Sequence, residues 1–313
     1  MDGLLIIDKP AGITSHDVVA RVRKILAQRR VGHTGTLDPF ATGVLVVLVG
    51  RATRLAQFLS GEEKEYDAVV RLGYETETGD ITGKAMSDAT KNTISVAALN
   101  AEEIEVALRS LRGEIDQVPP MYSAKKRNGR RLYELAHRGE LVSREPVRVT
   151  VHIFETVSRE GQILKDNADG TADLVIHVVC SAGTYVRTLA ESLGKQLRLG
   201  AHLAELRRIR AGDFHLSKAV SLEQLKEKVV EESLGTVLIP PDRALRRMPF
   251  ICLNDSAEQK VRRGIDVPIE EHSDGVPTEG QTVRMRDEAG RLLAVGYYDG
   301  RNKSLHPKVV LAS

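Results

Sequence analysis

A single acid stands in an unusual loop-like stretch near the N-terminus. Residues 31–45 read VGHTGTLDPFATGVL, and their only acid, Asp38, is followed by proline. Three glycines allow turns that a side chain would hinder; they are Gly32, Gly35 and Gly43. Residues 44–49 form a continuous apolar run, which is typical of a buried strand. We therefore expect a carboxylate held by a rigid loop against a sheet, where it could serve as a nucleophile or a base.

The same loop also has a purely structural interpretation. Glycine-rich connections between helix and strand are common, and an acid before proline often only starts a turn. A phosphate cradle fits less well, because the stretch holds no Gly-Lys-Ser or Gly-Lys-Thr and does not open a helix after a strand. Taken alone, the loop favours the structural interpretation. A catalytic role for Asp38 therefore requires other residues that could act with it.

Two other segments carry residues that could accompany Asp38. Tyr66 lies at the start of a predicted strand over 66–73, where packing is its ordinary role. Arg187 follows a glycine turn after a buried strand at 173–180, and its apolar neighbours indicate a buried arginine. A buried arginine requires a carboxylate partner. Asp38 is the candidate, because it is the acid that a rigid loop would hold in place.

Composition limits the class of protein. The 313 residues suffice for two domains, and 42% hydrophobic with 28% charged residues is ordinary for a soluble globular protein. Every apolar run is too short to span a bilayer, and the N-terminus lacks the pattern of a signal peptide. Cys180 and Cys252 are far apart, and no Cys or His pair has the spacing of a zinc site. We therefore expect a cytoplasmic protein without disulfides, metal or membrane association.

Positive charge gathers in three places although the net charge is only +2. The first is a predicted helix over 15–30, with Ser15 as its N-cap and Gly32 as its end; its cations are Arg21, Arg23, Lys24, Arg29 and Arg30. The second is the segment 121–149, with eight Lys or Arg against three Glu. The third comprises Arg198, Arg207, Arg208 and Arg210. Charge runs are usually solvated faces, but three in a nearly neutral chain favour a surface that binds a polyanion.

The order of elements predicts an α+β fold with a mixed, largely antiparallel sheet and flanking helices. Strands are expected at 4–7, 44–49, 66–73, 147–154 and 173–180, and helices at 15–30, 52–59, 100–112, 131–138, 184–197 and 221–230. Two of the helices begin with the spacing of a capping box, at Asn100 and at Ser221. A stretch with several prolines over 239–250 marks a boundary, and short strands with glycine turns follow it. We therefore divide the chain into 1–245 and a small β-rich domain, 246–313.

Several motifs together resemble those of the bacterial TruB-type tRNA pseudouridine synthases. Residues 32–39 resemble the catalytic loop of that family, with Asp38 at its aspartate, and 64–66 resemble its Lys-x-Tyr strand. The Pro-Pro-x-Tyr-Ser-Ala segment, the Tyr-x-Arg motif and the last signature of the catalytic domain are matched by 117–124, 183–187 and 200–208. The motifs occur in the expected order over most of residues 1–215, whereas the segment after Pro249 is similar only loosely to a PUA-like domain.

The resemblance implies a fold, a reaction and a set of site residues. It implies a pseudouridine synthase domain over 1–245 with a basic RNA-binding insertion at 121–149, and a PUA-like RNA-binding domain over 246–313. The implied reaction converts uridine 55 in the T-loop of tRNA to pseudouridine by base flipping; since it involves no redox change and no net addition, it requires no cofactor. The implied catalytic residues are Asp38, Tyr66 and Arg187, and the implied substrate-binding residues are His33, Tyr66, Tyr185, Leu206 and Lys126. The implied partner is the T-stem-loop of tRNA, bound by a monomer.

Physical chemistry suggests a role for several of these residues. Arg187 would keep Asp38 ionised and fix its direction. The ring of Tyr66 would stack on the extruded uracil, and its hydroxyl would transfer the proton at C5. Tyr185 would close the pocket and Leu206 would offer an apolar wall. The resemblance implies that His33 holds the T-loop open. Whether Asp38 attacks C6, attacks C1′ or removes a ribose proton stays open.

Two other functions compete with this interpretation. A protein that only binds or folds RNA would share the basic surfaces but would not need an acid and an arginine paired in a pocket. A hydrolase acting on nucleosides is a weaker alternative, because no recognisable motif sets a second acid beside Asp38.

Overall fold

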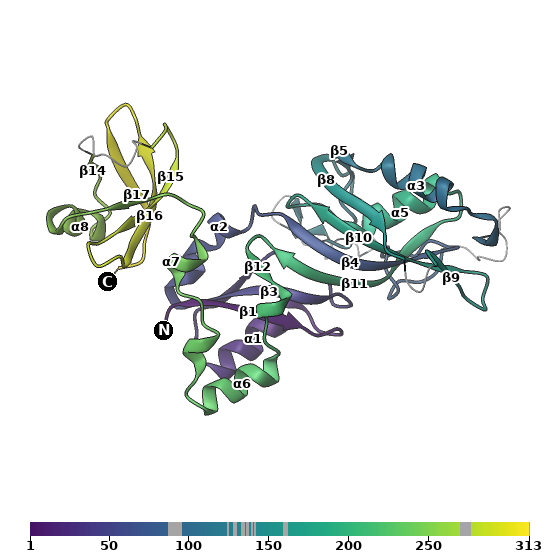
Figure 1. Cartoon of the computed structure of the whole chain (residues 1–313), viewed down its shortest axis with the longest axis horizontal. Coiled ribbons are helices and arrows are strands. Elements are labelled where there is room, and N and C mark those ends of the chain that lie inside the picture. Colours follow the sequence, from purple (N-terminus) through teal and green to yellow (C-terminus); the bar gives the residue numbers. More distant parts are fainter. Residues whose placement is uncertain are drawn as a thin grey trace.

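The structure is a computed structural model that describes every residue except 87–95, 124, 128–129, 133–134, 136–137, 139, 141, 159–161, 270–276 and 313. Within the described residues, the larger unit is built on a ten-stranded sheet (Figure 1). Its main path is β1 (Gly3–Lys9), β3 (Thr42–Val49), β11 (Ala201–Ala211), β4 (Lys64–Leu72), β10 (Ala172–Cys180), β8 (Val147–Thr156) and β5 (Gly113–Gln117). Three short strands join it, with β2 (Val31–Thr34) on β3, β9 (Leu164–Asp166) on β10 and β12 (Phe214–His215) on β11.

The predicted fold class is confirmed. Among the described strands of this sheet, β3 and β11 pair in parallel and the other neighbours are antiparallel. All five predicted strands are present as β1, β3, β4, β8 and β10. The parallel pairing joins the two halves of the sheet, so β3, with the loop before it, lies directly beside β11.

Helices cover the sheet in two groups. Helices α1 (Ser15–Ile25) and α6 (Leu222–Val230) pack against β1 and β3, whose side chains are buried on both faces. Helices α3 (Ala101–Arg109) and α5 (Val186–Gln196) pack over the other half, which explains the long buried stretches of β4 and β10.

Helix α1 differs from its prediction at both ends. Thr14, not Ser15, is the N-cap, because its hydroxyl accepts the backbone N–H of Asp17 while the Asp17 carboxylate accepts from Thr14. The helix ends at Ile25 rather than near residue 30, since Ala27 adopts a left-handed conformation with φ of 48°. The predicted stop at Gly32 was therefore wrong.

The other helix predictions had mixed outcomes. The capping boxes at Asn100 and Ser221 are confirmed. The single helix expected over 52–59 is instead a 3-10 turn, η1 (Gly50–Leu55), followed by the short α2 (Ala56–Leu59). The helix expected over 131–138 lies partly outside the described residues. Short 3-10 turns also occur at η3 (Val96–Ala98), η4 (Leu216–Lys218) and η5 (Leu234–Thr236).

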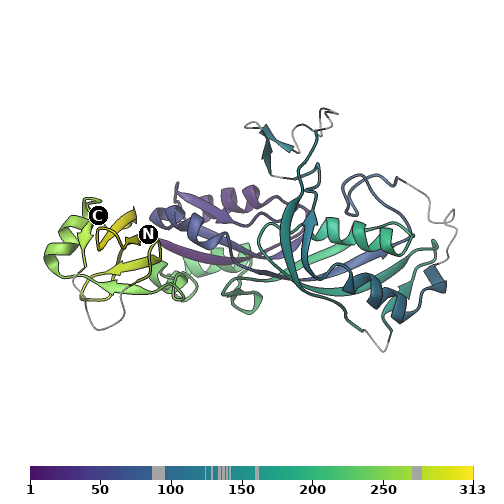
Figure 2. The same cartoon turned by 90° about the horizontal axis from the view of Figure 1, so that it is seen from above.

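The C-terminal part contains a second sheet, as the sequence indicated. In the described part of this segment it has five strands in the order β13 (Phe250–Cys252), β15 (Thr282–Arg286), β16 (Leu292–Asp299), β17 (Ser304–Val310) and β14 (Val267–Pro268). Helix α8 (Asp255–Arg262) packs against it, and α7 (Pro241–Ala244) leads into it. The small sheet lies at one end of an elongated molecule, beside the N-terminus (Figures 1 and 2).

A shared hydrophobic cluster joins the two sheets. Val295 and Val309 of the small sheet belong to the same cluster as Leu4 and Val46 of the large one, together with Leu245 from the connection. The exact boundary after residue 245 stays a prediction, because the apolar core crosses it. No described helix has both the length and the apolar composition that crossing a membrane would require.

Candidate active site

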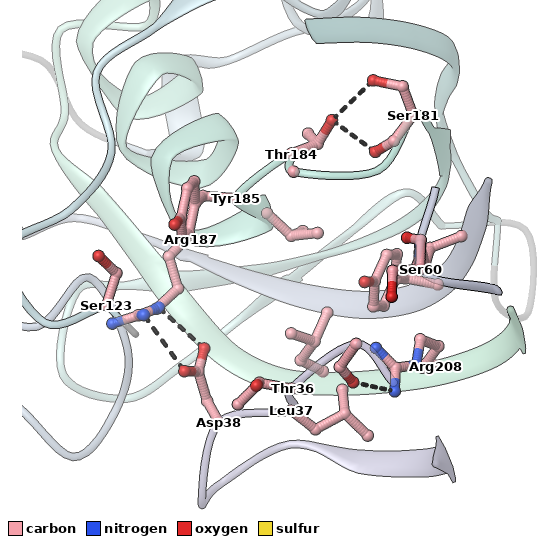
Figure 3. Close-up of a pocket in the computed structure, with 16 residues that line it drawn as sticks. Thr36, Leu37, Asp38, Ser60, Ser123, Ser181, Thr184, Tyr185, Arg187 and Arg208 are labelled. Carbon is pink, nitrogen blue, oxygen red and sulfur yellow. Dashed lines mark hydrogen bonds and ion pairs between the residues drawn. The ribbon is translucent and has the colours of Figure 1, made fainter. Parts of the chain in front are cut away.

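A pocket opens where the loop before β3 meets β4, β11 and the start of α5 (Figure 3). Five predicted site residues from distant parts of the chain line it: Asp38, Tyr66, Tyr185, Arg187 and Leu206. The other lining residues are Gly35, Thr36, Leu37, Ser60, Lys64, Ser123, Ser181, Gly183, Thr184, Val186 and Arg208. The sheet topology therefore brings together the motifs that the sequence holds far apart.

The loop that carries Asp38 is tied down on both sides of the acid. The Leu37 backbone N–H donates to Ser15 Oγ at 2.9 Å, and the Ser15 hydroxyl donates to the Leu37 carbonyl at 3.1 Å. On the other side, the ammonium of the buried Lys9 donates to the Pro39 carbonyl at 3.1 Å. Because these contacts hold the residues flanking Asp38, the carboxylate has a defined position at the pocket edge.

Arg187 grips the Asp38 carboxylate with two parallel contacts. Its Nε lies 3.0 Å from Asp38 Oδ2, and its Nη2 donates to Oδ1 at 3.2 Å (Figure 3). The guanidinium also donates to the carbonyls of Thr78 and Tyr122 at 2.8 and 2.7 Å. Arg187 is 4% exposed whereas the Asp38 side chain is 32% exposed, so the arginine is a buried anchor and the acid faces the pocket. The predicted pairing of these two residues is present.

A second acid supports the same arginine. Asp80 Oδ2 lies 3.7 Å from Arg187 Nη1, and Asp80 is buried. Its other oxygen accepts hydrogen bonds from the Thr78 hydroxyl and the Thr82 backbone N–H, which hold the carboxylate in place. The guanidinium thus stands between two carboxylates, of which Asp38 is the one that faces the pocket.

The electrostatic environment of Asp38 is a balance of opposing effects. Burial raises the pKa of its carboxyl above the usual value, and the charge of Asp80 acts in the same direction. The Arg187 guanidinium opposes this shift, and the Lys9 ammonium opposes it more weakly. A carboxylate that is desolvated yet directed by one arginine is more reactive toward a bound group than a fully hydrated one.

Strand alternation sets Tyr66 and Leu206 on the pocket side of the sheet. Tyr66 on β4 is the cross-strand neighbour of Arg208 on β11, and Leu206 faces Ala68 one step along. Burial raises the pKa of the Tyr66 phenol, and the nearby Arg208 charge opposes that shift. A neutral phenol and an apolar side chain therefore form the floor of the pocket, a surface suited to a flat ring.

Tyr185 lies at the N-cap position of α5 and is held through its backbone. Its N–H donates to Gln117 Oε1 at 2.7 Å, and its carbonyl accepts from Gln117 Nε2 at 3.0 Å. These bonds connect β5 to the start of α5, where Arg187 sits in the first turn. The helix predicted over 184–197 is present as α5, with Tyr185 at its N-cap and Arg187 in its first turn.

Of the predicted substrate-binding residues whose side chains the structure describes, His33 does not line the pocket. His33 lies on β2, and its ring packs edge-on against His16 at a centroid distance of 5.3 Å. Burial lowers the pKa of His33 to about 4, with the charges of His16 and Arg208 acting in the same direction, so its ring is neutral at physiological pH. Lys126 belongs to β6 (Lys126–Arg127), which pairs with β7 (Arg130–Arg131) in a small hairpin that projects from the body (Figure 2). The side chain of Lys126 lies outside the described residues.

The third predicted basic group is largely not a free cationic surface. Arg207 pairs with Asp8 at 2.7 Å, and Arg210 pairs with Glu65. Arg208 is buried below the Asp38 loop, where it donates to the carbonyl of Gly35 at 2.8 Å. By contrast, the cations of the first group are exposed on α1 and beyond its end.

Known proteins are similar to this chain in sequence. The model of the TruB family pseudouridylate synthase N-terminal domain matches residues 23–186, and that of the tRNA pseudouridylate synthase B C-terminal domain matches 187–246. A protein of Solibacter usitatus named tRNA pseudouridine synthase B is 40% identical over 311 residues, 99% of this chain and 100% of that protein. A protein of the same name from Geobacillus thermodenitrificans is 42% identical over 84% of this chain and 85% of its own. This chain belongs to the TruB family.

Solved structures agree with this assignment. A chain from the crystal structure of a Cbf5–Nop10–Gar1 complex superimposes with a TM-score of 0.72 at 28% identity, covering 98% of this chain and 84% of its own. A chain from an H/ACA RNP bound to a substrate RNA containing 2′-deoxyuridine gives 0.70 at 26% identity, covering 99% and 85%. The sequence-based assignment to this family is confirmed, and with it the prediction of a pseudouridine synthase.

The matched C-terminal model of the TruB family ends at residue 246, before the small sheet begins. It covers α5, β11 and the following helices, which belong to the large unit. The likeness of residues 246–313 to a PUA-like domain therefore stays a prediction that rests on the loose resemblance of the sequence.

Sequence reasoning missed three residues of this TruB-family site. Asp80 lies in a turn without any motif that would mark it as an acid for Arg187. Arg208 was grouped with surface charges, although its alternation with Leu206 along one strand would have indicated an inward side chain. Lys64 was read only as part of a motif, yet it is 8% exposed and lines the pocket. Among the described residues, no group of three or more His, Cys, Asp or Glu side chains is arranged to hold a metal ion.

Proposed function

We propose that this protein converts uridine 55 in the T-loop of tRNA to pseudouridine. The observation that carries the proposal is the Asp38 carboxylate, which Arg187 holds at the edge of a pocket floored by Tyr66 and Leu206. The names of the bacterial relatives, tRNA pseudouridine synthase B, support tRNA as the substrate. The similar chain in a complex with substrate RNA supports RNA binding by this fold.

Asp38, Tyr66 and Arg187 divide the chemical work in this proposal. The uridine leaves its stack and enters the pocket, which requires a few kcal/mol. Stacking of the uracil on the Tyr66 ring returns about 1–3 kcal/mol of that energy. The ionised Asp38 then acts on the ribose or the base, while Arg187 fixes its direction. After the base has turned, the Tyr66 hydroxyl relays the C5 proton, releasing its own proton to water as it takes up the one from C5.

The remaining predicted residues would bind the RNA around the flipped nucleotide. Tyr185 closes the pocket beside Asp38, and His33, which is neutral and partly exposed on β2, packs into the opened T-loop. The hairpin with Lys126 folds over the loop, and the exposed cations of α1 follow the phosphates of the stem. The small C-terminal sheet binds RNA as a PUA-like domain. We expect the protein to act as a monomer in the cytoplasm.

A site-mapped tritium-release assay tests the proposal. Unmodified tRNA transcript labelled with tritium at C5 of its uridines is incubated with the full-length protein, and released tritium is counted per transcript. We expect release to level off at one tritium per tRNA. A transcript with cytidine in place of uridine 55 should release none, whereas a transcript with cytidine in place of a uridine outside the T-loop should behave like the unaltered one.

Each alternative gives a different outcome in the same assay. A protein that only binds RNA would retain the transcript on a filter without releasing tritium. A nucleoside hydrolase would release free uracil from the RNA instead of an isomerised nucleotide. Equal tritium release from the transcript without uridine 55 would contradict the proposed position.

A further inference from the structure

Two buried cations in the pocket wall lack a carboxylate partner. Lys64 is 8% exposed and Arg208 is 1% exposed. Among the described residues, neither has a carboxylate oxygen within 4.0 Å, in contrast to Arg187. The Lys64 ammonium donates to the carbonyl oxygens of Ser60, at 2.8 Å, and Glu62. Buried charges normally lie beside a group of opposite charge. Two buried cations in a pocket wall without a carboxylate partner therefore indicate that the negative charge is supplied by a bound molecule.

The two cations lie together, away from the acid. A Cβ on Gly35 would lie 3.4 Å from Arg208 Nη1 and 3.7 Å from Lys64 Cε, so both flank this glycine. Arg208 also donates from Nε to the Val44 carbonyl at 2.7 Å, which fixes the guanidinium. Figure 3 shows Arg208 on the far side of Thr36 and Leu37 from the Asp38–Arg187 pair. The pocket therefore has one neutralised end and one end with excess positive charge.

Electron counting identifies the anion, given the proposed function on which this inference rests. Uracil enters as a neutral ring. When the N1–C1′ bond breaks, the bonding pair stays with the base, and the negative charge spreads over N1, O2 and O4. A bond then forms between C5 and C1′, the C5 proton leaves, and N1 takes up a proton. If Asp38 instead adds to C6, the charge appears on the base as an enolate, so the base is negative in either route.

We propose that Lys64 and Arg208 form an electropositive wall that stabilises the negative charge on the uracil during isomerisation. The wall retains the base while it turns, because a detached uracil anion is attracted to two fixed cations in a site of low dielectric constant. Such preorganised charges act only when charge develops, and removing one typically lowers the rate by about 10²-fold. Both cations line the pocket, and both are buried, with Lys64 8% and Arg208 1% exposed.

A comparison of two RNAs tests the wall. The fluorine of 5-fluorouracil withdraws electrons, so its anion is more stable than that of uracil and needs less help. T-stem-loop RNAs with uridine or 5-fluorouridine at the target position are reacted with excess enzyme, and loss of the N1-linked nucleoside is followed after digestion. For Lys64→Met we expect a rate loss of about 10²-fold on uridine and a much smaller loss on 5-fluorouridine.

Lys9→Met is the matched control. Lys9 is also buried, its ammonium also donates to carbonyls, and burial likewise lowers its pKa to about 8, but it holds the loop and does not line the pocket. A structural loss from Lys9→Met should lower both rates by the same factor. Lys64→Arg keeps the charge and should keep the wild-type ratio of the two rates, which also covers the case that Lys64→Met folds poorly.

The pH dependence gives a second readout. Around Lys64 stand Arg208 from β11, Cys180 from β10, Tyr66 on its own strand and Glu62 in the preceding turn. Burial raises the pKa of Cys180 to about 11 and keeps that of Tyr66 above its usual value, so both stay neutral while Lys64, with a pKa of about 8, loses its proton. Lys9, with a pKa also of about 8, titrates in both proteins, so we expect the rate on uridine to fall less above pH 8 in Lys64→Arg than in the wild type.

The outcomes separate this proposal from the proposed function. If Lys64→Met lowers the reaction rate by the same factor on both RNAs, or does not lower it on uridine, the electropositive wall is overturned. The enzyme would still be a pseudouridine synthase in that case. A wild-type protein that leaves uridine in the T-stem-loop unchanged would overturn the proposed function itself.

Discussion

Replacing Lys64 by methionine should stabilise the folded protein at neutral pH while it harms activity. Burial lowers the pKa of the Lys64 ammonium from 10.5 to about 8. Because one pKa unit corresponds to about 1.4 kcal/mol, the charged form destabilises the fold by roughly 3 kcal/mol. The variant loses two hydrogen bonds to the carbonyls of Ser60 and Glu62, each worth about 1 kcal/mol. We therefore expect a net gain of about 1 kcal/mol in unfolding free energy.

The sign of the pH dependence follows from the same shift. Between pH 8 and 10.5 the folded wild type has lost the Lys64 proton while the unfolded chain still binds it, so Lys64 makes stability rise with pH over this interval. Lys64→Met lacks this contribution, so its advantage should shrink as the pH rises from 8 and, at about 1.4 kcal/mol per pH unit, reverse at about pH 9. Lys9 is present in both proteins and cancels in the difference.

Urea denaturation at several pH values from about 7 to 10 measures the difference directly. The slope of the difference in unfolding free energy should approach about 1.4 kcal/mol per pH unit. Unfolding free energies of the two proteins that run parallel through this range would refute the assignment of a depressed pKa to Lys64.

Three more predictions concern the loop, the acid and the RNA surface. Gly43→Ala should unfold or severely destabilise the protein, because a Cβ there would lie 2.2 Å from the Arg208 carbonyl oxygen and the backbone φ is +99°. Gly12→Ala is the control: its φ is +82° but the space around it is open, so its unfolding free energy in urea should fall by only about 1–2 kcal/mol. Since burial raises the pKa of Asp38, kcat/KM should fall on the acid side with a midpoint above the ordinary aspartate value of 3.8, and a midpoint below it would count against a desolvated base. Affinity for tRNA should fall steeply with salt, and replacing Arg29 and Arg30 by Ala should reduce the slope of log K against log salt by about two; an unchanged slope would show that these residues do not contact phosphates.

Much of the fold followed from patterns that are local in sequence. The strands at 44–49 and from Tyr66 could be assigned because a strand buried on both faces leaves a short run of apolar residues in the sequence. Capping boxes at Asn100 and Ser221 were correct because they involve residues three apart. Helix α1 ends earlier than predicted because Ala27 adopts a left-handed conformation. Alanine strongly favours helices, so the sequence gives no signal for this end.

The site was predictable in part, for a physical reason. Arg187 could be matched to Asp38 because a buried guanidinium demands an acid, and the chain offered one on a loop of its own. Asp80 could not be found in this way, because its proximity to Arg187 depends on how a turn folds back over α5. Arg208 was mistaken for a surface charge since its burial depends on the pairing of β11 with β4 and β3.

The Asp38→Asn variant tests the central claim most directly. The amide keeps the shape and can still accept from Arg187, so the fold and tRNA binding should persist, whereas tritium release from C5 should fall below detection. Asp173→Asn is the matched control, because Asp173 forms a similar two-contact pair with Arg71, at 2.7 and 2.9 Å, outside the pocket. Full tritium release by Asp38→Asn, at the rate of Asp173→Asn, would contradict the claim that the Asp38 carboxylate carries the reaction.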